Sequence, residues 1–313
     1  MVMGSPLHVA VGVVRDLAGR ILLTQRAKHV HQGGLWEFPG GKLEHGESAL
    51  QALRRELREE VGIEVLSARP LIKVRHRYPD LQVLLDVWRV DGFAGIATAH
   101  EDQAMRWVEA DQLNQYDFPA ANLPIITASR LPDRYAILEG RSPEQVLTNF
   151  GRIIDSGVSL LQLRSKSLAP AEIHALYRRV SADCRQHGIK LLINSDLPLF
   201  DANADGIHLS SRALMIARSR PAKYEWVAAS CHNLQELRHA EQIGVDFAVL
   251  APILPTPTHP EVTPLGWEHM EKLIEQVNLP VFALGGLKLE DIARVAEAGG
   301  QGIAGISAFL GQA

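Results

Sequence analysis

Residues 41–63 read GKLEHGESALQALRRELREEVGI, and this stretch decides the fold of the first third of the chain. It continues a Phe-Pro-Gly-Gly segment at residues 38–41, which predicts a glycine-rich loop, and then changes to helical spacing. Four apolar side chains recur three and four residues apart and therefore share one face of a helix, which we expect to be buried. They are Leu50, Leu53, Leu57 and Val61. Gly62 stands where a glycine commonly ends a helix, so the sequence predicts that the helix stops there.

Three glutamates lie beside the apolar face of this helix. Glu56, Glu59 and Glu60 fall within an arc of roughly 100°, where like charges repel one another. A divalent cation held by oxygen ligands turns that repulsion into binding, and the hard ion Mg²⁺ suits such a site. Mn²⁺ accepts the same ligands. The alternative is a solvated helix on which neighbouring arginines, Arg55 among them, neutralise the glutamates.

The complete spacing pattern favours the metal site. Its specified positions are Gly41, Glu47, Arg55, Glu56, Leu57, Glu59, Glu60, Gly62 and Ile63. They fill every place of the Nudix box, so the segment resembles the metal and diphosphate site of a Nudix hydrolase. The resemblance implies metal ligation by Gly40, Glu56, Glu59 and Glu60, with Arg55 orienting the glutamates.

The resemblance extends to MutT-type 8-oxo-dGTP diphosphatases over roughly residues 6–130. The shared features are Arg26, LWEFPGGK at residues 35–42, the turn Tyr-Pro-Asp at 78–80 and FPAAN at 118–122. They imply nucleotide contacts by Arg26, Glu37, Phe38 and Asn122. The amide of Asn122 carries both a donor and an acceptor, so it can read a purine edge that oxidation has altered.

Two further positions matter for the chemistry that this resemblance implies. Glu37 and Glu101 occupy places that join the metal set. Metal ions would polarise the bridged phosphates and activate an attacking water molecule, and Glu56 or Glu101 would accept its proton. The products would be a nucleoside monophosphate and pyrophosphate. Leu81 stands at a position where the MutT pattern commonly has an arginine. The lost polar contact predicts looser selectivity for the base.

Composition limits the other classes of function. The chain has 313 residues, which predicts two domains, and its 46% apolar and 22% charged residues are typical of soluble globular proteins. Its net charge of −4 gives no basic excess for a nucleic-acid polymer. No signal peptide and no apolar run near the ~20 residues of a membrane span are visible. The two cysteines have no metal-type spacing, and we expect a cytoplasmic protein.

Strand-like segments surround the acidic helix. Residues 7–14 and 21–26 are predicted to pair as a hairpin. Further strands are expected at residues 36–38, 68–76, 82–90 and 105–108. The Nudix resemblance implies that they form a mixed sheet in an α/β/α sandwich. Residues 120–131 show little helical or strand signal, and we interpret them as the linker between domain 1–130 and domain 131–313.

The second domain alternates short β-type runs with amphipathic stretches of helix length. The eight runs are residues 135–138, 160–164, 190–194, 206–209, 226–230, 247–252, 280–285 and 302–307. Eight runs, each followed by helix-like sequence, predict a (β/α)₈ TIM barrel. Its active residues should lie at the carboxyl ends of the strands. Polar or small residues collect there: Gln162, Arg164, Lys166, Asn194, Ser230, His232, Thr256, Thr258, Gly285, Gly286 and Ser307.

A phosphate site is expected after the last two strands, where TIM barrels commonly bind phosphate. The pair Gly285-Gly286 allows close approach of the backbone. The segment Ile306-Ser307 is predicted to lead into a helix whose N–H groups face an anion.

The barrel sequence resembles the thiamine phosphate synthase/TenI superfamily over roughly residues 133–311. The matching segments are QLRSK at residues 162–166, DGIHL at 205–209 and PTPT at 255–258. The resemblance implies that Gln162, Arg164, Lys166 and Asn194 face a pyrimidine diphosphate. It assigns a thiazole phosphate to Thr256, Thr258, Gly286 and Ser307, with Ser230 and Gly285 beside these two sets.

The departures from the synthase pattern concern the metal. Ser195 and Ala213 mark the places of the two aspartates that hold Mg²⁺ in synthases, and His259 replaces a lysine that stabilises departing pyrophosphate. Asp196 is displaced by one residue, which turns a strand side chain to the opposite face. Stabilisation of the leaving group would therefore be weak, and we do not expect an efficient synthase.

Three readings of the barrel and its partner domain stay open. TenI proteins use a histidine after the fifth strand as the base of thiazole tautomerisation, and His232 matches it; alternatively, His232 only caps the next helix. The barrel could instead be a non-catalytic sensor of a thiazole or thiamine phosphate. The Nudix domain could clear thiamine-related diphosphates rather than oxidised nucleotides.

Overall fold

The computed structural model describes residues 6–27, 32–79, 81–99, 103–165, 167–199, 203–256 and 261–311. The chain divides into two compact units, Met1–Leu131 and Pro132–Ala313. Three predicted site residues, Glu101, Lys166 and Thr258, lie outside the described residues, and so does His259. Within the described ranges, no helix combines the length and the apolar character that crossing a membrane requires.

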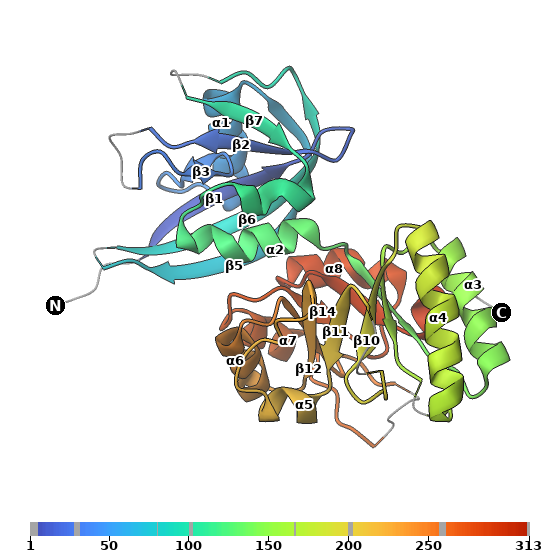
Figure 1. Cartoon of the computed structure of the whole chain (residues 1–313). Helices are drawn as coiled ribbons and strands as arrows, with labels where there is room; N and C mark the ends of the chain where they lie inside the picture. Colours follow the sequence, from blue (N-terminus) through green and yellow to red (C-terminus); the bar gives the residue numbers. More distant parts are fainter. Residues whose placement is uncertain are drawn as a thin grey trace. The chain divides into compact units, whose positions relative to one another are not determined.

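The first unit contains two sheets (Figure 1). One has the order β4-β1-β6-β5, with strands Gly40–Lys42, Leu7–Val14, Gln82–Ala94 and Glu64–Arg77. The other has the order β3-β2-β7, with strands Trp36–Glu37, Ile21–Gln25 and Met105–Val108. The first sheet is mixed, because β1 runs parallel to β6 and antiparallel to β4.

The predicted hairpin between residues 7–14 and 21–26 is wrong. β1 and β2 lie in different sheets and are joined only by an isolated bridge between Arg15 and Ile21. The reason is that β4 and β6 already occupy both edges of β1. The prediction of a glycine-rich loop is also wrong in part, since Gly40 and Gly41 form β4 and pair with β1.

Two helices cover opposite faces of these sheets. Helix α1, Ala49–Val61, begins at Ser48, whose side chain and Gln51 form a capping box. It ends at Gly62, which has the left-handed φ of 69°. The apolar face of α1 buries Leu53, Leu57 and Val61 against one side of the sheets, as its spacing predicts.

Residues 120–131, interpreted from the sequence as a linker, are helical. A 3₁₀ helix, η2 (Ala120–Asn122), leads into α2, Leu123–Arg130. Pro124 lies in the first turn, where proline is tolerated. Ile125 and Ala128 are fully buried in the core on the other side of the sheets from α1, and this packing stabilises a segment whose own helical signal is weak. A second 3₁₀ segment, η1 (Ala110–Gln115), precedes η2 in this unit.

The second unit is a closed barrel of eight parallel strands surrounded by helices (Figure 1). The strands are β8 (Arg134–Leu138), β9 (Leu160–Leu163), β10 (Lys190–Asn194), β11 (Gly206–Leu209), β12 (Trp226–Cys231), β13 (Phe247–Leu250), β14 (Val281–Ala283) and β15 (Gly302–Gly305). The helices are α3 (Pro143–Asp155), α4 (Pro170–Gln186), α5 (Ser211–Ile216), α6 (Leu234–Ile243), α7 (Trp267–Ile274) and α8 (Ile292–Glu297), with 3₁₀ segments η3 (Leu289–Asp291) and η4 (Ser307–Phe309). The predicted TIM barrel is confirmed.

One connection departs from the prediction that every strand is followed by a helix. The described residues between β10 and β11, 195–199 and 203–205, contain no helix. The whole connection has eleven residues, slightly fewer than the dozen that a crossover with a helix usually needs.

The barrel interior has an aromatic lower part and a polar upper part. Tyr135, Phe247 and Phe282 contact one another, with ring centroids 5.3–5.7 Å apart. Toward the carboxyl ends of the strands come Gln162, Asn194 and His208, each at most 4% exposed. A polar layer in a closed barrel faces no bulk water, so each of its groups needs a partner from the protein or from a ligand.

Candidate functional site

The first unit contains a cavity of about 660 Å³ that joins two chemically different walls. One wall carries Glu56, Glu59 and Glu60 of α1, together with Gly40 and Gly41 of β4. The other carries aliphatic side chains of β1 and β6, with Phe38 and Asn122. The volume falls in the usual range of ligand pockets.

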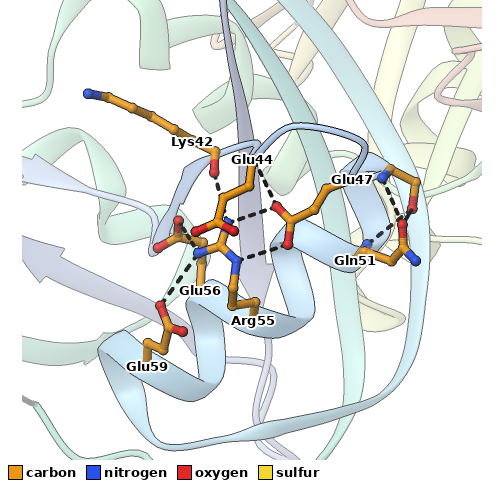
Figure 2. A network of polar contacts seen from close by, with 8 residues as sticks. Lys42, Glu44, Glu47, Gln51, Arg55, Glu56 and Glu59 are labelled. Carbon is orange, nitrogen blue, oxygen red and sulfur yellow. Dashed lines mark hydrogen bonds and ion pairs between the residues drawn. The ribbon is translucent and has the colours of Figure 1, made fainter.

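Arg55 organises the acidic wall (Figure 2). Its guanidinium donates two hydrogen bonds of 2.9 Å to the carboxylate of Glu47 and one of 2.8 Å to Glu56. It lies 3.4 Å from Glu59 and donates to the carbonyl of Lys42 at 2.9 Å. The hydrogen bonds from Arg55 lower the pKa of Glu47 to about 2, and those with Glu47 and Glu56 raise the pKa of Arg55. A planar guanidinium has enough fixed donors for all these contacts, whereas an ammonium does not.

The glycine strand approaches the glutamates closely. The N–H of Gly40 donates to Glu60 at 2.9 Å. Burial raises the pKa of Glu60, and this hydrogen bond opposes the rise. A Cβ atom at Gly41 would lie 2.1 Å from the carboxyl carbon of Glu56. The fit therefore leaves no room for a side chain at position 41 unless Glu56 moves.

Glu37 and Arg26 form an ion pair beside this wall. Burial raises the pKa of Glu37 to about 7, although the charge of Arg26 acts in the opposite direction. Both side chains line the cavity.

The second wall is largely apolar. Two cross-strand pairs of β1 and β6, Leu7 with Val83 and Val9 with Leu85, contribute to it. Phe38 also lines the cavity and stacks on Phe118 with ring centroids 5.5 Å apart. Asn122 is only 7% exposed and supplies a polar edge. An apolar lining with one amide beside it suits an aromatic ring whose rim bears hydrogen-bonding groups.

The donor set of the acidic wall fits a hard divalent ion, because it consists of oxygens only and carries several negative charges. The residues that would hold the ion are Glu56, Glu59 and Glu60, with Gly40 beside them. Among the residues that the structure describes, no three acidic, histidine or cysteine side chains already converge on one point. Arg55 holds two of the glutamates and the N–H of Gly40 holds the third.

The barrel brings together several residues predicted at its strand ends. The Nε2 of Gln162 is buried and has no hydrogen-bond partner, and the side chain is 1% exposed. The Oδ1 of Asn194 accepts from the N–H of Asp196. Arg164 lies 4.0 Å from Glu139. A buried amide without a partner is costly, so Gln162 indicates a place where a ligand would supply an acceptor.

At one of the two metal positions of the synthase pattern, Ser195 is hydrogen-bonded to Ser210, which also contacts Asp196. The Oγ of Ser195 accepts from the N–H of Ser210 at 2.9 Å, and the Oγ of Ser210 donates to Asp196 at 2.8 Å. The expectation that Asp196 points to the opposite face is wrong. Strand β10 ends at Asn194, so the alternation of a strand no longer applies two residues later.

His208 and Tyr135 were missed by the sequence analysis. The Nδ1 of His208 lies 3.0 Å from the hydroxyl of Tyr135, and its Nε2 lies 2.9 Å from the Oγ of Ser230. Burial lowers the pKa of His208 to about 3, and Arg164 contributes in the same direction. The imidazole is therefore neutral at physiological pH. A histidine inside an apolar parallel strand was the signal that could have revealed it.

His232 lies just after β12, with half of its side chain exposed. Its ring Nδ1 is 3.0 Å from Glu236 Oε2, and its backbone N–H donates to the same oxygen at 2.7 Å. The structure therefore places His232 beside the first turn of α6, where a capping role and a catalytic role are both compatible with the contacts.

The region of the predicted phosphate site agrees only in part with the expectation. Gly285 and Gly286 have φ values of +104° and +66°. Cβ atoms there would lie 2.8 Å from Pro252 and 2.4 Å from the carbonyl oxygen of Pro255, respectively. The helix expected after Ile306 is a 3₁₀ helix of three residues, Ser307–Phe309, and it is followed by Gly311 with its left-handed φ of 71°. Thr256 is described, whereas Thr258 is not.

The folds and sites define two classes of domain. One is an α/β/α domain whose cavity is lined by a carboxylate-bearing helix and an apolar wall, and the other is a TIM barrel with polar residues at its strand ends. A family model described as NUDIX domain matches residues 10–128, and one described as thiamine monophosphate synthase matches residues 134–309. The chain is thus a fusion of a MutT-like Nudix hydrolase domain with a barrel, and it belongs to the thiamine monophosphate synthase/TenI family.

Three relatives illustrate the two halves. The "8-oxo-dGTP diphosphatase" of Escherichia coli is 40% identical over 120 residues, which are 38% of this chain and 93% of that protein. The "CTP pyrophosphohydrolase" of the same organism is 42% identical over 120 residues, 38% of this chain and 87% of that protein. The "Putative thiamine-phosphate synthase 2" of Aquifex aeolicus is 37% identical over 185 residues, 58% of this chain and 98% of that protein. The first unit is accordingly a Nudix pyrophosphohydrolase domain.

Proposed function

We propose that the first unit hydrolyses an oxidised purine nucleoside triphosphate, such as 8-oxo-dGTP, to the monophosphate and pyrophosphate, with Mg²⁺ or Mn²⁺. The observation that carries this proposal is that one cavity is lined both by the acidic wall and by the apolar wall with Asn122. A triphosphate at one end and a base at the other match these walls in charge and in shape.

Each residue of the cavity has a role in this proposal. A divalent ion held by Glu56, Glu59 and Glu60 would supply positive charge to the phosphate chain. Arg55 orients Glu56 and Glu59 through the hydrogen bonds described above. Arg26 and Lys42 place positive charge at the cavity, while Phe38 and Asn122 hold the base. Glu56 or Glu101 accepts the proton of the attacking water molecule.

The test is pyrophosphate release from 8-oxo-dGTP by the full chain with Mg²⁺. Glu56→Gln and Glu59→Gln should each reduce kcat/KM by more than about 100-fold, beyond the range seen for residues that only support metal ligands. Full activity in either variant would contradict the proposal.

A pyrimidine nucleotide is a second candidate substrate. Leu81 lines the cavity with an apolar side chain, at a position where the MutT pattern commonly has an arginine that could make a selective polar contact. The likeness to a protein named CTP pyrophosphohydrolase also favours it. Asn122→Ala should raise KM for 8-oxo-dGTP, because the edge contact is lost. Parallel assays with CTP and thiamine-related diphosphates rank the three substrate classes.

We further propose that the barrel binds a thiazole or thiamine phosphate and is not an efficient synthase. The buried, unpaired Nε2 of Gln162 supports a ligand, and the Ser195–Ser210 pair supports the lack of a metal site. Gln162, Arg164, Lys166 and Asn194 would face the pyrimidine part of such a ligand, and Thr256, Thr258, Gly286 and Ser307 would hold the thiazole phosphate, with Ser230 and Gly285 beside them. His232 would then act as the base of a thiazole tautomerase.

Calorimetry with thiamine phosphate, which carries both the pyrimidine and the thiazole phosphate, and the full chain tests the binding. Gln162→Leu should weaken it at least tenfold, because the amide that the ligand would satisfy is gone. Absence of binding to the wild-type protein would contradict this second proposal, and efficient coupling of a pyrimidine diphosphate to the thiazole would contradict the assignment as a poor synthase.

A further inference from the structure

We propose that Glu236 is a positioning residue that holds the ring of His232 in the tautomer with its proton on Nδ1, which leaves Nε2 unprotonated at the barrel mouth. The catalytic consequence of this arrangement rests on the proposed tautomerase function. The arrangement itself rests on the contacts of Glu236.

The contact between the two side chains decides which nitrogen carries the proton. Glu236 Oε2 lies 3.0 Å from Nδ1 of His232. A carboxylate oxygen can only accept a hydrogen bond, so Nδ1 is the donor. The neutral ring has a single N–H, and its Nε2 is then left with a lone pair that can accept a proton.

Glu236 is itself held in place from two sides. Its Oε1 accepts a hydrogen bond of 2.8 Å from Ser211 Oγ at the start of α5. Its Oε2 also accepts a hydrogen bond of 2.7 Å from the backbone N–H of His232. The carboxylate is 14% exposed, compared with 50% for the ring of His232. The carboxylate is therefore the fixed partner, and the ring is the part that reaches solvent or a ligand.

His232 lies at the carboxyl end of a barrel strand. Ser230 points into the barrel, where it contacts His208, and side chains of a strand alternate between its two faces. Cys231 is fully buried in the layer between strands and helices. His232 lies one position beyond the carboxyl end of β12, at the edge where TIM barrels place their reactive groups.

A purely structural role for Glu236 has to be separated from this one. Glu236 lies in the first turn of α6, and its own N–H donates to the side chain of the N-cap, Asn233, at 3.0 Å. Asn233→Ala removes that cap without touching the ring of His232. It serves as the matched control, because it weakens the same helix start.

The experiment measures the tautomer of His232 in the full chain by ¹⁵N NMR of the imidazole ring, with His232→Gln to assign the signal. At about pH 8.5, well above the usual histidine pKa of about 6.5, the ratio of the Nδ1–H to the Nε2–H form is read directly. We expect Nδ1–H to predominate in the wild-type protein and in Asn233→Ala. In Glu236→Gln the ratio should fall at least about tenfold, because the amide can donate as well as accept.

A wild-type ring that is mostly Nε2–H, or a ratio unchanged in Glu236→Gln, would overturn the proposal. An equal fall in Asn233→Ala would overturn it too, since the effect would then come from the helix cap. Turnover of a thiazole phosphate, measured separately, tests only the tautomerase. If the wild-type protein does not convert the thiazole phosphate, the proposed tautomerase function is wrong. The tautomer ratio of His232 still decides whether Glu236 positions the ring.

Discussion

Gly41→Ala is the most direct test of how the glycine strand and the acidic helix work together. The added Cβ would lie 2.1 Å from the carboxyl carbon of Glu56 and 2.2 Å from its Oε1, whereas ordinary contact begins at 3.4 Å. The backbone of Gly41 is paired with Ala10 in the sheet and is not free to move. The carboxylate of Glu56 is the end of a flexible side chain, so it is the group that yields, by about 1 Å.

The magnitude follows from that displacement. A reacting group misplaced by about 1 Å costs about 100-fold in rate, which equals about 2.7 kcal/mol of transition-state stabilisation. Thermal unfolding should hardly change, because no buried apolar contact is lost and the strain is relieved at a side-chain end. The assay is pyrophosphate release from 8-oxo-dGTP at saturating Mg²⁺, together with a melting curve of the same preparation.

Gly151→Ala is the control for the same chemical change. It lies in α3, and nothing stands within 4 Å of an added Cβ, so activity should equal that of the wild-type protein. Activity of Gly41→Ala within about threefold of wild type would refute the reasoning, because Glu56 would then tolerate the displacement. Loss of activity together with a large fall in melting temperature would show that the sheet, not the carboxylate, had yielded.

Other parts of the molecule give further expectations. Arg55→Lys should lower kcat/KM by roughly 10–100-fold and weaken Mg²⁺ binding in titrations, because an ammonium cannot make the forked contact with Glu47 and still reach Glu56; unchanged metal affinity would contradict this. The pKa of His208 is lowered to about 3 in the folded barrel, whereas the unfolded value is about 6.5, so below about pH 6.5 only the unfolded chain takes up the proton. Stability is therefore complete above that pH and declines by up to about 1.4 kcal/mol per pH unit as the pH falls toward 3. Urea unfolding at several pH values should show this slope diminished in His208→Gln. Tyr135→Phe should cost about 1–3 kcal/mol in the same measurement, because a buried nitrogen of His208 loses its partner.

The acidic helix and the barrel strands were predictable because their signals are local. The spacing of Leu53, Leu57 and Val61 fixes the buried face of α1 whatever surrounds it, and Gly62 marks the end of the helix. The barrel strands are short apolar runs that recur eight times, so an error in one would not change the architecture.

The features that escaped prediction depend on partners distant in sequence. β1 and β2 look like a hairpin because they are adjacent, yet β6, some 70 residues later, takes the edge that β2 would need. α2 is stabilised by burial of Ile125 and Ala128, which no local pattern reveals. The contacts of Arg55 with Glu47 and of His232 with Glu236 likewise need coordinates, since the sequence shows charges but not which of them meet.

The two candidate sites differ in whether their polar side chains already have partners, and this difference bears on the ligands that they would bind. In the acidic wall, Glu56 and Glu60 have a partner within the protein and still face the cavity, so a ligand there must compete with Arg55 and Gly40 for their oxygens. In the barrel, Gln162 has a donor with no partner, and a ligand would relieve a cost rather than replace a contact. A ligand that competes with Arg55 and Gly40 for these oxygens therefore needs more than one positive charge, as a divalent metal ion has. A neutral or singly charged ring with one acceptor is enough for the second.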